Sequence, residues 1–346
     1  MRFKDYPAII RKAWKEYDGS KVVKHIEDIS ARVSTNHVFK IWLENDDVLI
    51  AKLSYFGRYE HFKEDHQIIH ALANNLLYPF ENVMAKSLMK NNKLFTYHYK
   101  DDFLDTWVVF YNPIRVLNKL PRRLDDNDIK TFAVQMAKFH QACFRAKNVL
   151  PKSSKTLQSD VADLLQITAS ERGQYEHRLN IDTIRRQCDL FLNNAQMLNY
   201  EAFDQIPVFV DWNIGNFSVN DKMELFSRWD YDWFRVSSRM LDFYFFSRVV
   251  SDVGDRTAFT YNHSPMAHDR FVLFLQEYHR VYPLTANEVR FLKEAYRFFI
   301  LNYVIKYGQF FFHRTYATQL QREVYQTHLP SLDGFDVDKL LKALHL

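Results

Sequence analysis

Three polar residues between positions 211 and 230 have the types and the spacing that phosphoryl transfer requires. Asp211 and Asn216 lie five positions apart within an apolar run, and Asp230 follows at the end of a second short apolar segment. Turn-forming residues at 220–222 separate the two segments, so a hairpin would bring Asp230 beside the other two. One carboxylate can take the proton of an attacking hydroxyl, while an amide oxygen and a second carboxylate hold Mg²⁺ on the phosphates of a nucleotide. Because Asp and Asn are also ordinary turn residues, the weight of this hypothesis lies in the ordered set.

The ordered set resembles the catalytic core of the aminoglycoside phosphotransferase and choline kinase-like families, which are small-molecule kinases with the protein-kinase fold. Their catalytic string is His-x-Asp-x-x-x-x-Asn, a short hairpin, a strand that ends in Asp, and a later Asp. By this resemblance Asp211 is the catalytic base, and Asn216 and Asp230 are the metal ligands. Asp242 would brace the catalytic loop through backbone hydrogen bonds. The resemblance implies ATP and Mg²⁺ as cofactors and a small hydroxylated molecule as the acceptor.

Two residues near this core leave questions open. Phe209 stands where the resembling kinases have histidine, which lies behind the catalytic loop and hydrogen-bonds to backbone near the metal-binding Asp. Its ring has no donor, and the flanking Val208 and Val210 suit a buried strand, so we expect packing to replace that hydrogen bond. Asp232 has two interpretations, since it would either assist with a second metal ion or cap the following loop.

Lys52 ends an apolar strand, a position where a charge is costly to bury without a partner. By the resemblance it reaches the phosphates of the nucleotide and pairs with a glutamate of the next helix. Glu64 is the expected partner, and Glu60 and Asp65 are close competitors. The alternative for Lys52 is a strand-end lysine whose charged head extends to solvent.

Further nucleotide contacts are expected from a loop and a hinge. Ser34, Thr35 and Asn36 lie between two strand-like segments, where the resembling kinases carry the loop that covers the nucleotide. This loop lacks their frequent glycine, so we expect its phosphate contacts to be looser or to use hydroxyls; an ordinary hairpin loop is the alternative. Asn112 precedes Pro113 at the end of a strand-like segment, where a hinge would meet the adenine, although an ordinary strand end fits as well.

The elements that must position these residues follow one order along the chain. Residues 1–25 begin with helical spacing, alternating strands continue to residue 111 around a helix over 59–74, and helical periodicity dominates afterwards. The order predicts an α+β, two-lobed, protein-kinase-like fold. A small antiparallel-sheet lobe over 1–111 would bind the nucleotide, and a larger, mainly helical lobe over 112–346 would hold the catalytic residues and the acceptor.

Composition narrows the function further. The 346 residues carry a net charge of +4 with cations and anions interspersed, which argues against a nucleic-acid partner. Neither Gly-x-Gly-x-x-Gly nor Gly-Lys-Ser/Thr occurs, which excludes the Rossmann and P-loop phosphate cradles. Cys143 and Cys188 show no metal-like spacing and are predicted to be buried packing residues in a reducing compartment. With no signal-peptide pattern and no membrane partner indicated, we predict a cytoplasmic protein.

Two other classes remain in view. A catalytically degenerate kinase-like module would bind nucleotide or a partner protein without turnover, and Phe209 with the glycine-poor loop favours it. Retention of Asp211 beside both metal positions favours the enzyme, because a module without turnover has no evident need for a base. A protein kinase proper is weakened by the lack of Asp-Phe-Gly and Ala-Pro-Glu segments.

Overall fold

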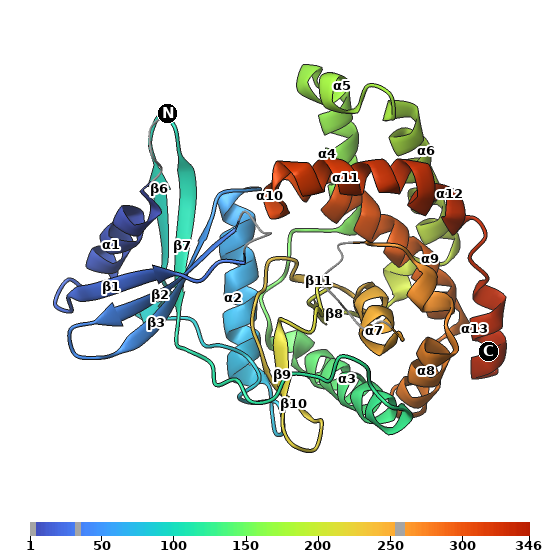
Figure 1. Ribbon diagram of the computed structural model, residues 1–346, viewed down its shortest axis with the longest axis horizontal. Helices are drawn as coiled ribbons and strands as arrows, with labels where there is room; N and C mark the ends of the chain where they lie inside the picture. Colours follow the sequence, from blue (N-terminus) through green and yellow to red (C-terminus); the bar gives the residue numbers. More distant parts are fainter. Residues whose placement is uncertain (1–4, 32–35, 253–259) are drawn as a thin grey trace.

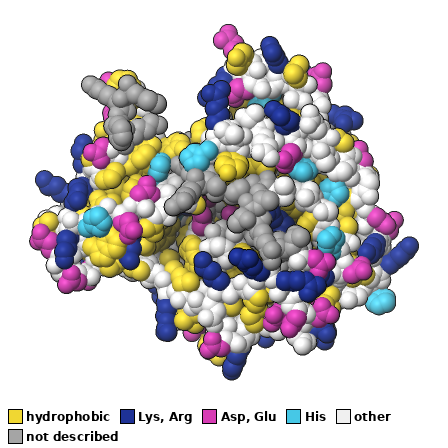
Figure 2. Space-filling view, viewed as in Figure 1, with side chains coloured by type: hydrophobic (Ala, Val, Ile, Leu, Met, Phe, Trp, Pro, Cys, Tyr) yellow, Lys and Arg dark blue, Asp and Glu magenta, His cyan; other side chains and the backbone are white. Residues whose placement is uncertain are grey.

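The computed structural model describes residues 5–31, 36–252 and 260–346. An antiparallel sheet forms the core of a smaller lobe, and a larger, mainly helical lobe follows it in the chain (Figure 1). The expected α+β, two-lobed architecture is confirmed. Acidic and basic side chains are interspersed over both lobes on the face drawn in Figure 2. No helix in the described part of the chain is both long and apolar enough to cross a membrane.

The smaller lobe is a five-stranded antiparallel sheet in the order β1-β2-β3-β7-β6. Helix α1 ends at Tyr17, where Asp18 caps it. Residues 93–100 form two separate strands, because β5 pairs with β4 and β6 pairs with β7. The elements of this lobe are α1 (Tyr6–Tyr17), β1 (Val23–Asp28), β2 (His37–Leu43), β3 (Val48–Ser54), α2 (Tyr59–Asn75), β4 (Met89–Lys90), β5 (Lys93–Leu94), β6 (Thr96–Lys100) and β7 (Asp105–Tyr111).

Strand alternation places Lys52 on the side of the sheet that faces the catalytic residues. Leu49, Ala51 and Leu53 of β3 are buried in an apolar cluster with the inner face of α1, including Trp14. Each such buried aliphatic side chain contributes about 1.5–3 kcal/mol, so this cluster holds α1 firmly on one face of the sheet. Lys52 has the opposite parity in the strand, and it therefore points away from α1 toward the interlobe cleft.

In its described residues the larger lobe is helical apart from four short strands. The helical periodicity predicted after residue 111 is confirmed, and α4, α5 and α6 occupy most of residues 151–205. Thr285 and Glu288 form a reciprocal capping box at the start of α9. The helices are α3 (Asp126–Ala146), α4 (Leu157–Ala169), α5 (Glu171–His177), α6 (Ile181–Met197), α7 (Phe243–Val250), α8 (Asp269–Val281), α9 (Ala286–Phe299), a π-helical segment (Ile300–Lys306), α10 (Gly308–Phe311), α11 (Arg314–Glu323), a second π-helical segment (Val324–His328), α12 (Leu329–Leu332) and α13 (Val337–Leu344).

Two strand pairs flank the segments that contain Asp211, Asn216 and Asp230. β8 (Gln205–Val208) pairs with β11 (Arg235–Ser238), and β9 (Phe217–Val219) forms a hairpin with β10 (Leu225–Arg228). The turn of this hairpin lies at 220–222 as predicted, where the Asn220 side chain accepts hydrogen bonds from the backbone N–H groups of Lys222 and Glu224. The backbone N–H of Arg228 also donates to the carbonyl of Val83 at 2.6 Å, which attaches the hairpin to the segment that follows α2.

Candidate active site

The catalytic turn begins where β8 ends, and a buried carboxylate holds it in place. Asp242 Oδ1 accepts hydrogen bonds from the backbone N–H groups of Phe209 at 3.1 Å and Val210 at 2.6 Å. Val210 has a φ of 60°, an unfavourable conformation for a β-branched residue that persists only when its surroundings hold it. The prediction that Asp242 braces the catalytic loop through backbone hydrogen bonds is confirmed.

Asp242 is itself fixed by a buried chain of hydrogen bonds. Its Oδ2 lies 2.9 Å from His140 Nε2, and His140 Nδ1 lies 2.8 Å from the Tyr278 hydroxyl. The side chains of His140 and Asp242 are fully buried. The histidine of α3 therefore supports the catalytic turn from behind and has no direct contact with the cleft.

Asp211 and Asn216 are brought together by the tight turn between them. Asn216 Nδ2 donates to Asp211 Oδ2 at 3.0 Å, and the backbone N–H of Asn213 donates to Asp211 Oδ1 at 3.2 Å. These bonds orient the carboxylate of Asp211. Because the amide nitrogen of Asn216 is turned toward Asp211, the oxygen of the same amide is the atom that a cation would contact.

Lys52 joins the sheet lobe to the segment that contains Asp230. Its Nζ lies 3.3 Å from Asp230 Oδ1 and also forms an ion pair with Asp232, and its side chain is only 7% exposed. Burial opposes the charge of Lys52, but the two carboxylates raise its pKa above the ordinary value. Lys52 therefore stays protonated, and the solvent-directed alternative is wrong.

The two carboxylates beside Lys52 titrate differently. Burial alone would raise the pKa of Asp230, but the charges of Lys52 and Arg228 bring it below the ordinary value. Burial and then repulsion from Asp230 raise the pKa of Asp232 to about 6. Asn36 Nδ2 donates to Asp232, so the expected loop residue contacts this acidic pair. Asp232 thus acts as an ion-pair partner of Lys52, a role that neither of its two earlier interpretations contained.

The predicted pairing of Lys52 with Glu64 is wrong. Glu64 Oε1 accepts hydrogen bonds from the Ser153 hydroxyl at 3.1 Å and from the backbone N–H of Ser154 at 2.7 Å. The competitor Asp65 pairs with Lys155 at 2.5 Å, and Glu60 is exposed. The rotation of α2 about its axis directs these acidic side chains toward the helical lobe or the solvent, so Lys52 takes its carboxylate partners from the opposite lobe.

A cavity of about 550 Å³ lies between the lobes, next to Lys52, Asn216 and Asp230. Its size falls within the range of small-ligand sites in proteins, roughly 300–1,000 Å³. Asn112 lines it, and the backbone N–H of Asn112 donates to the carbonyl of Lys86 at 2.9 Å. Ser34 and Thr35 lie outside the described residues. Apolar side chains form most of the wall, namely Ile29, Ala31, Val38, Ile50, Ala85, Tyr111, Pro113, Ile114, Val116, Trp229 and Tyr231.

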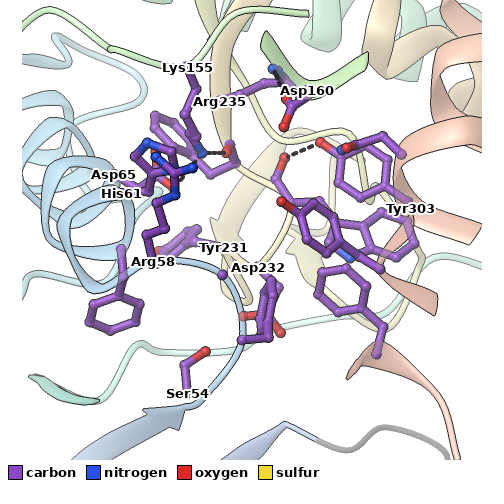
Figure 3. A pocket seen from close by; sticks show the side chains of 18 of the residues that line it. Ser54, Arg58, His61, Asp65, Lys155, Asp160, Tyr231, Asp232, Arg235 and Tyr303 are labelled. Carbon is purple, nitrogen blue, oxygen red and sulfur yellow. Dashed lines mark hydrogen bonds and ion pairs between the residues drawn. The ribbon is translucent and has the colours of Figure 1, made fainter. Parts of the chain in front are cut away.

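A second, smaller cavity of about 90 Å³ lies beyond Asp232, and Tyr231 lines both cavities (Figure 3). Among the described residues, four buried polar atoms in its wall have no hydrogen-bond partner: the acceptors Asp65 Oδ1, His66 Nε2 and Asn302 Oδ1, and the donor Arg235 Nε. His66 Nδ1 lies 2.8 Å from the carbonyl of Phe62, so Nδ1 carries the proton and Nε2 is the acceptor. Unsatisfied buried acceptors are costly, and they suit a ligand that carries donors.

Aromatic side chains enclose this second cavity on the side of the π-helical segment. Trp233 stacks on Tyr303 at 4.8 Å between ring centroids, and Phe311 meets Phe56 edge-on at 4.7 Å. Arg235 pairs with Asp160 at 2.7 Å, and Lys306 of the same π-helical segment pairs with Asp160 at 3.1 Å; Figure 3 labels Arg235 and Asp160. The cavity thus combines an aromatic wall with fixed charges of both signs.

The donor set of the main site fits Mg²⁺ in the way that nucleotide-bound magnesium is usually held. No group of three or more His, Cys, Asp or Glu side chains with metal-site geometry is found in the described ranges. A Mg²⁺ ion carried by a nucleotide needs only one or two protein oxygens besides the phosphates. Asn216 and Asp230 supply an amide and a carboxylate oxygen on adjacent segments, which satisfies that requirement.

The comparisons with known proteins bear on the fold. No protein-family model and no curated protein sequence matches the chain. Among solved structures, the amicoumacin kinase hAmiN in complex with AMP-PNP, Ca²⁺ and Ami superposes with a TM-score of 0.64 at 12% identity, over 97% of both chains. The chain has an aminoglycoside phosphotransferase-type kinase fold.

Two further structures of this fold extend nearly end to end along the chain. The streptomycin–ATP complex of APH(2")-IIa matches at 15% identity with a TM-score of 0.52, covering 98% of this chain and 99% of the other. Macrolide 2'-phosphotransferase type I matches at 11% identity with a TM-score of 0.52, covering 93% and 98%. At these identities the likeness establishes the fold, and the chemistry rests on the residues of the site.

Arg228 is the residue of the site that the sequence reasoning missed. It is completely buried, and it donates to the carbonyl oxygens of Asp211 at 2.9 Å, of Trp229 at 2.7 Å and of Asp230. The signal was present in the sequence, because Arg228 ends an apolar strand just as Lys52 does. The same cost argument that identified Lys52 applies to it.

Proposed function

We propose that this protein is an ATP- and Mg²⁺-dependent phosphotransferase that transfers the γ-phosphate to a hydroxyl group of a small molecule. The observation that carries this proposal is the convergence of Lys52 on Asp230, whose side chains come from opposite lobes and lie 3.3 Å apart. Asp211 and Asn216 lie on the adjoining turn, beside a cavity of nucleotide size. We place the reaction in the cytoplasm, where ATP is abundant and the free, buried cysteines Cys143 and Cys188 remain reduced.

Each residue has a separate task in the transfer. Lys52 neutralises charge on the nucleotide phosphates, and Asn216 and Asp230 would hold Mg²⁺, which would offset the charge of the phosphate oxygens. The acceptor oxygen forms a bond to the γ-phosphorus as the bond from that phosphorus to the β–γ bridging oxygen breaks, leaving ADP. The hydroxyl proton of the acceptor passes to the carboxylate of Asp211. Asn216 and Asn213 keep that carboxylate oriented for the proton transfer.

The larger cavity suits the base and ribose of ATP. Ile50 from the sheet lobe and Tyr231 from the helical lobe line it together with Asn112 at the hinge. Because the N–H of Asn112 already donates to Lys86, we expect the adenine to be recognised by apolar contact and backbone carbonyls there.

The second cavity suits a donor-bearing part of the acceptor. Its three unpartnered hydrogen-bond acceptor atoms could bind hydroxyl or amine groups of the substrate. Its volume of about 90 Å³ admits only a few atoms of such a molecule. Asn302→Leu separates this role from a structural one. Removing an unsatisfied buried amide should leave the melting temperature unchanged or higher, while the KM for the acceptor rises. An unchanged acceptor KM would place the acceptor elsewhere.

The direct test is ADP release measured against a panel of hydroxylated metabolites and antibiotics. We expect at least one acceptor to stimulate Mg²⁺-dependent ADP release. Asp211→Asn should abolish the stimulated rate with little change in ATP affinity, because Asp211 handles the acceptor proton and not the phosphates. A wild-type protein that binds Mg²⁺ and ATP but is stimulated by no acceptor would support the degenerate, nucleotide-binding module instead.

A further inference from the structure

Arg228 is a buried charge whose partners are backbone carbonyls. None of its surface is exposed, and among the described residues it forms no ion pair within 4.0 Å. Its Nη1 donates to the carbonyl oxygens of Trp229 and Asp230, and its Nη2 donates to that of Asp211. Burying a guanidinium without a directly paired carboxylate is costly, so its stabilisation depends on these carbonyls and on more distant negative charges.

The carbonyls that Arg228 binds belong to the two turns on which the reaction depends. One turn carries Asp211 and contains Val210 at a φ of 60°, and the other contains Asp230 at a φ of 63°. The φ of Val210 is unfavourable for a β-branched residue and persists because its surroundings hold it, whereas Asp tolerates the left-handed region. The planar fork of the guanidinium connects these two turns directly, with one Nη on each.

The flat face of the guanidinium rests on Phe209. Its central carbon lies 4.3 Å from the centroid of the Phe209 ring and 5.1 Å from that of Trp212, which are favourable cation–π distances. Phe209 is fully buried, and its ring has no hydrogen-bond donor. A histidine at position 209 would supply a donor but a weaker surface for the guanidinium, so Phe209 and Arg228 form a matched pair.

We propose that Arg228 is a positioning residue that fixes the separation and orientation of Asp211 and Asp230, with Phe209 as the surface that holds its guanidinium. The proposal rests on the proposed function for its effect on turnover. It also predicts an effect on nucleotide binding that can be measured in the absence of catalysis. If Asp230 is held by this cross-link, then the gain in ATP affinity that Mg²⁺ provides depends on Arg228.

The test uses Arg228→Met and Arg228→Lys in the full-length protein. Methionine keeps an unbranched apolar chain without donors, and lysine keeps the charge but cannot span both turns with one planar fork. We expect Arg228→Met to lower kcat by about 100-fold, as misplacement of catalytic groups by about 1 Å does, and to raise the KM for ATP in the presence of Mg²⁺ by about tenfold. By calorimetry, the gain in ATP affinity on adding Mg²⁺ should fall by about tenfold, while Mg²⁺-free ATP affinity stays unchanged. For Arg228→Lys, both kcat and the increase in ATP affinity on adding Mg²⁺ should lie between those of the wild type and Arg228→Met.

Two further variants separate positioning from stability. Phe191→Ala removes a fully buried ring of α6 in the helical lobe, so it should lower the melting temperature without changing kcat. The double variant Phe209→His with Arg228→Met places a hydrogen-bond donor behind the turn that carries Asp211. Its kcat should be about tenfold higher than that of Arg228→Met. A double variant no more active than Arg228→Met would remove Phe209 from the proposal.

The outcomes distinguish this proposal from the proposed function. If no acceptor stimulates turnover by the wild-type protein, the proposed phosphotransferase function is wrong. A smaller increase in ATP affinity on adding Mg²⁺ to Arg228→Met would still support the positioning role of Arg228. A folded Arg228→Met or Arg228→Lys variant that keeps the wild-type Mg²⁺ gain and wild-type turnover would overturn the positioning role. A wild-type protein in which Mg²⁺ leaves ATP affinity unchanged would overturn both.

Discussion

Replacing Asp242 tests whether one buried carboxylate holds the catalytic turn. Asp242→Ala would remove the acceptor for the N–H groups of Phe209 and Val210 and the partner of His140 Nε2. Each buried polar group that loses its partner costs about 1–3 kcal/mol. With three groups affected and partial rescue by water in the space left behind, we expect a loss of about 4 kcal/mol in the free energy of unfolding.

Asp242→Asn is the matched variant because it keeps the shape of the side chain. Its amide oxygen can still accept from both backbone N–H groups, and its NH₂ can donate to His140 Nε2 if the ring changes tautomer. The two N–H bonds become neutral and lose about half their strength, so we expect a cost of about 1–2 kcal/mol. Asp102→Ala, an exposed substitution in the sheet lobe, should stay within about 0.5 kcal/mol of the wild type.

Denaturant unfolding and steady-state kinetics together measure the effect. At a temperature where all variants are folded, Asp242→Ala should lower kcat by about 100-fold, because Val210 relaxes from its unfavourable φ and moves Asp211. Asp242→Asn should lower it much less. If Asp242→Ala unfolds within about 1 kcal/mol of the wild type and retains its kcat, the carboxylate does not hold the turn and this reasoning is wrong.

Three other predictions follow from single contacts. Asp230→Ala should remove most of the increase in ATP affinity that Mg²⁺ provides, as measured by calorimetry; an unchanged increase would exclude Asp230 as a ligand. Phe209→Ala should lower the free energy of unfolding by about 3–5 kcal/mol, because the ring is fully buried. A variant with the melting temperature of the wild type would contradict the packing role of Phe209. Burial and the charge of Lys52 lower the pKa of His66 to about 3, so the unfolded chain takes up a proton below pH ~6.5 that the folded protein refuses. Stability present at neutral pH is therefore lost as the pH falls, and between pH 7 and pH 5 the wild type should lose about 2 kcal/mol more than His66→Phe does.

The parts of the site that the sequence revealed are local in the chain. Asp211 and Asn216 share one turn, and the hairpin that delivers Asp230 has turn residues at its tip. In each case the physical cause lies within one or two elements, so spacing and residue type are sufficient to predict it.

The contacts that sequence reasoning missed depend on how elements rotate against each other. Glu60, Glu64 and Asp65 lie on one helix, and only the rotation of that helix in the packed structure decides which of them faces Lys52. None does: packing turns Glu64 toward Ser154, and Lys52 finds its carboxylates 178 or more positions later in the chain. The contacts of Arg228 were missed for a related reason. Its three carbonyl partners belong to turns whose backbone geometry cannot be predicted from residue types alone.

The absence of the usual histidine is explained when every backbone polar group of the catalytic turn is followed to its partner. Asp242 accepts from the N–H groups of Phe209 and Val210. The N–H groups of Asp211 and Trp212 donate to the carbonyls of Phe209 and Val210, at 2.6 and 3.0 Å. The carbonyl of Asp211 accepts from Arg228. Buried backbone groups must be paired, and the groups named here are paired without a donor from the side chain of residue 209. Position 209 is therefore free to carry an apolar ring, provided that Asp242 and Arg228 remain to hold the two sides of the turn.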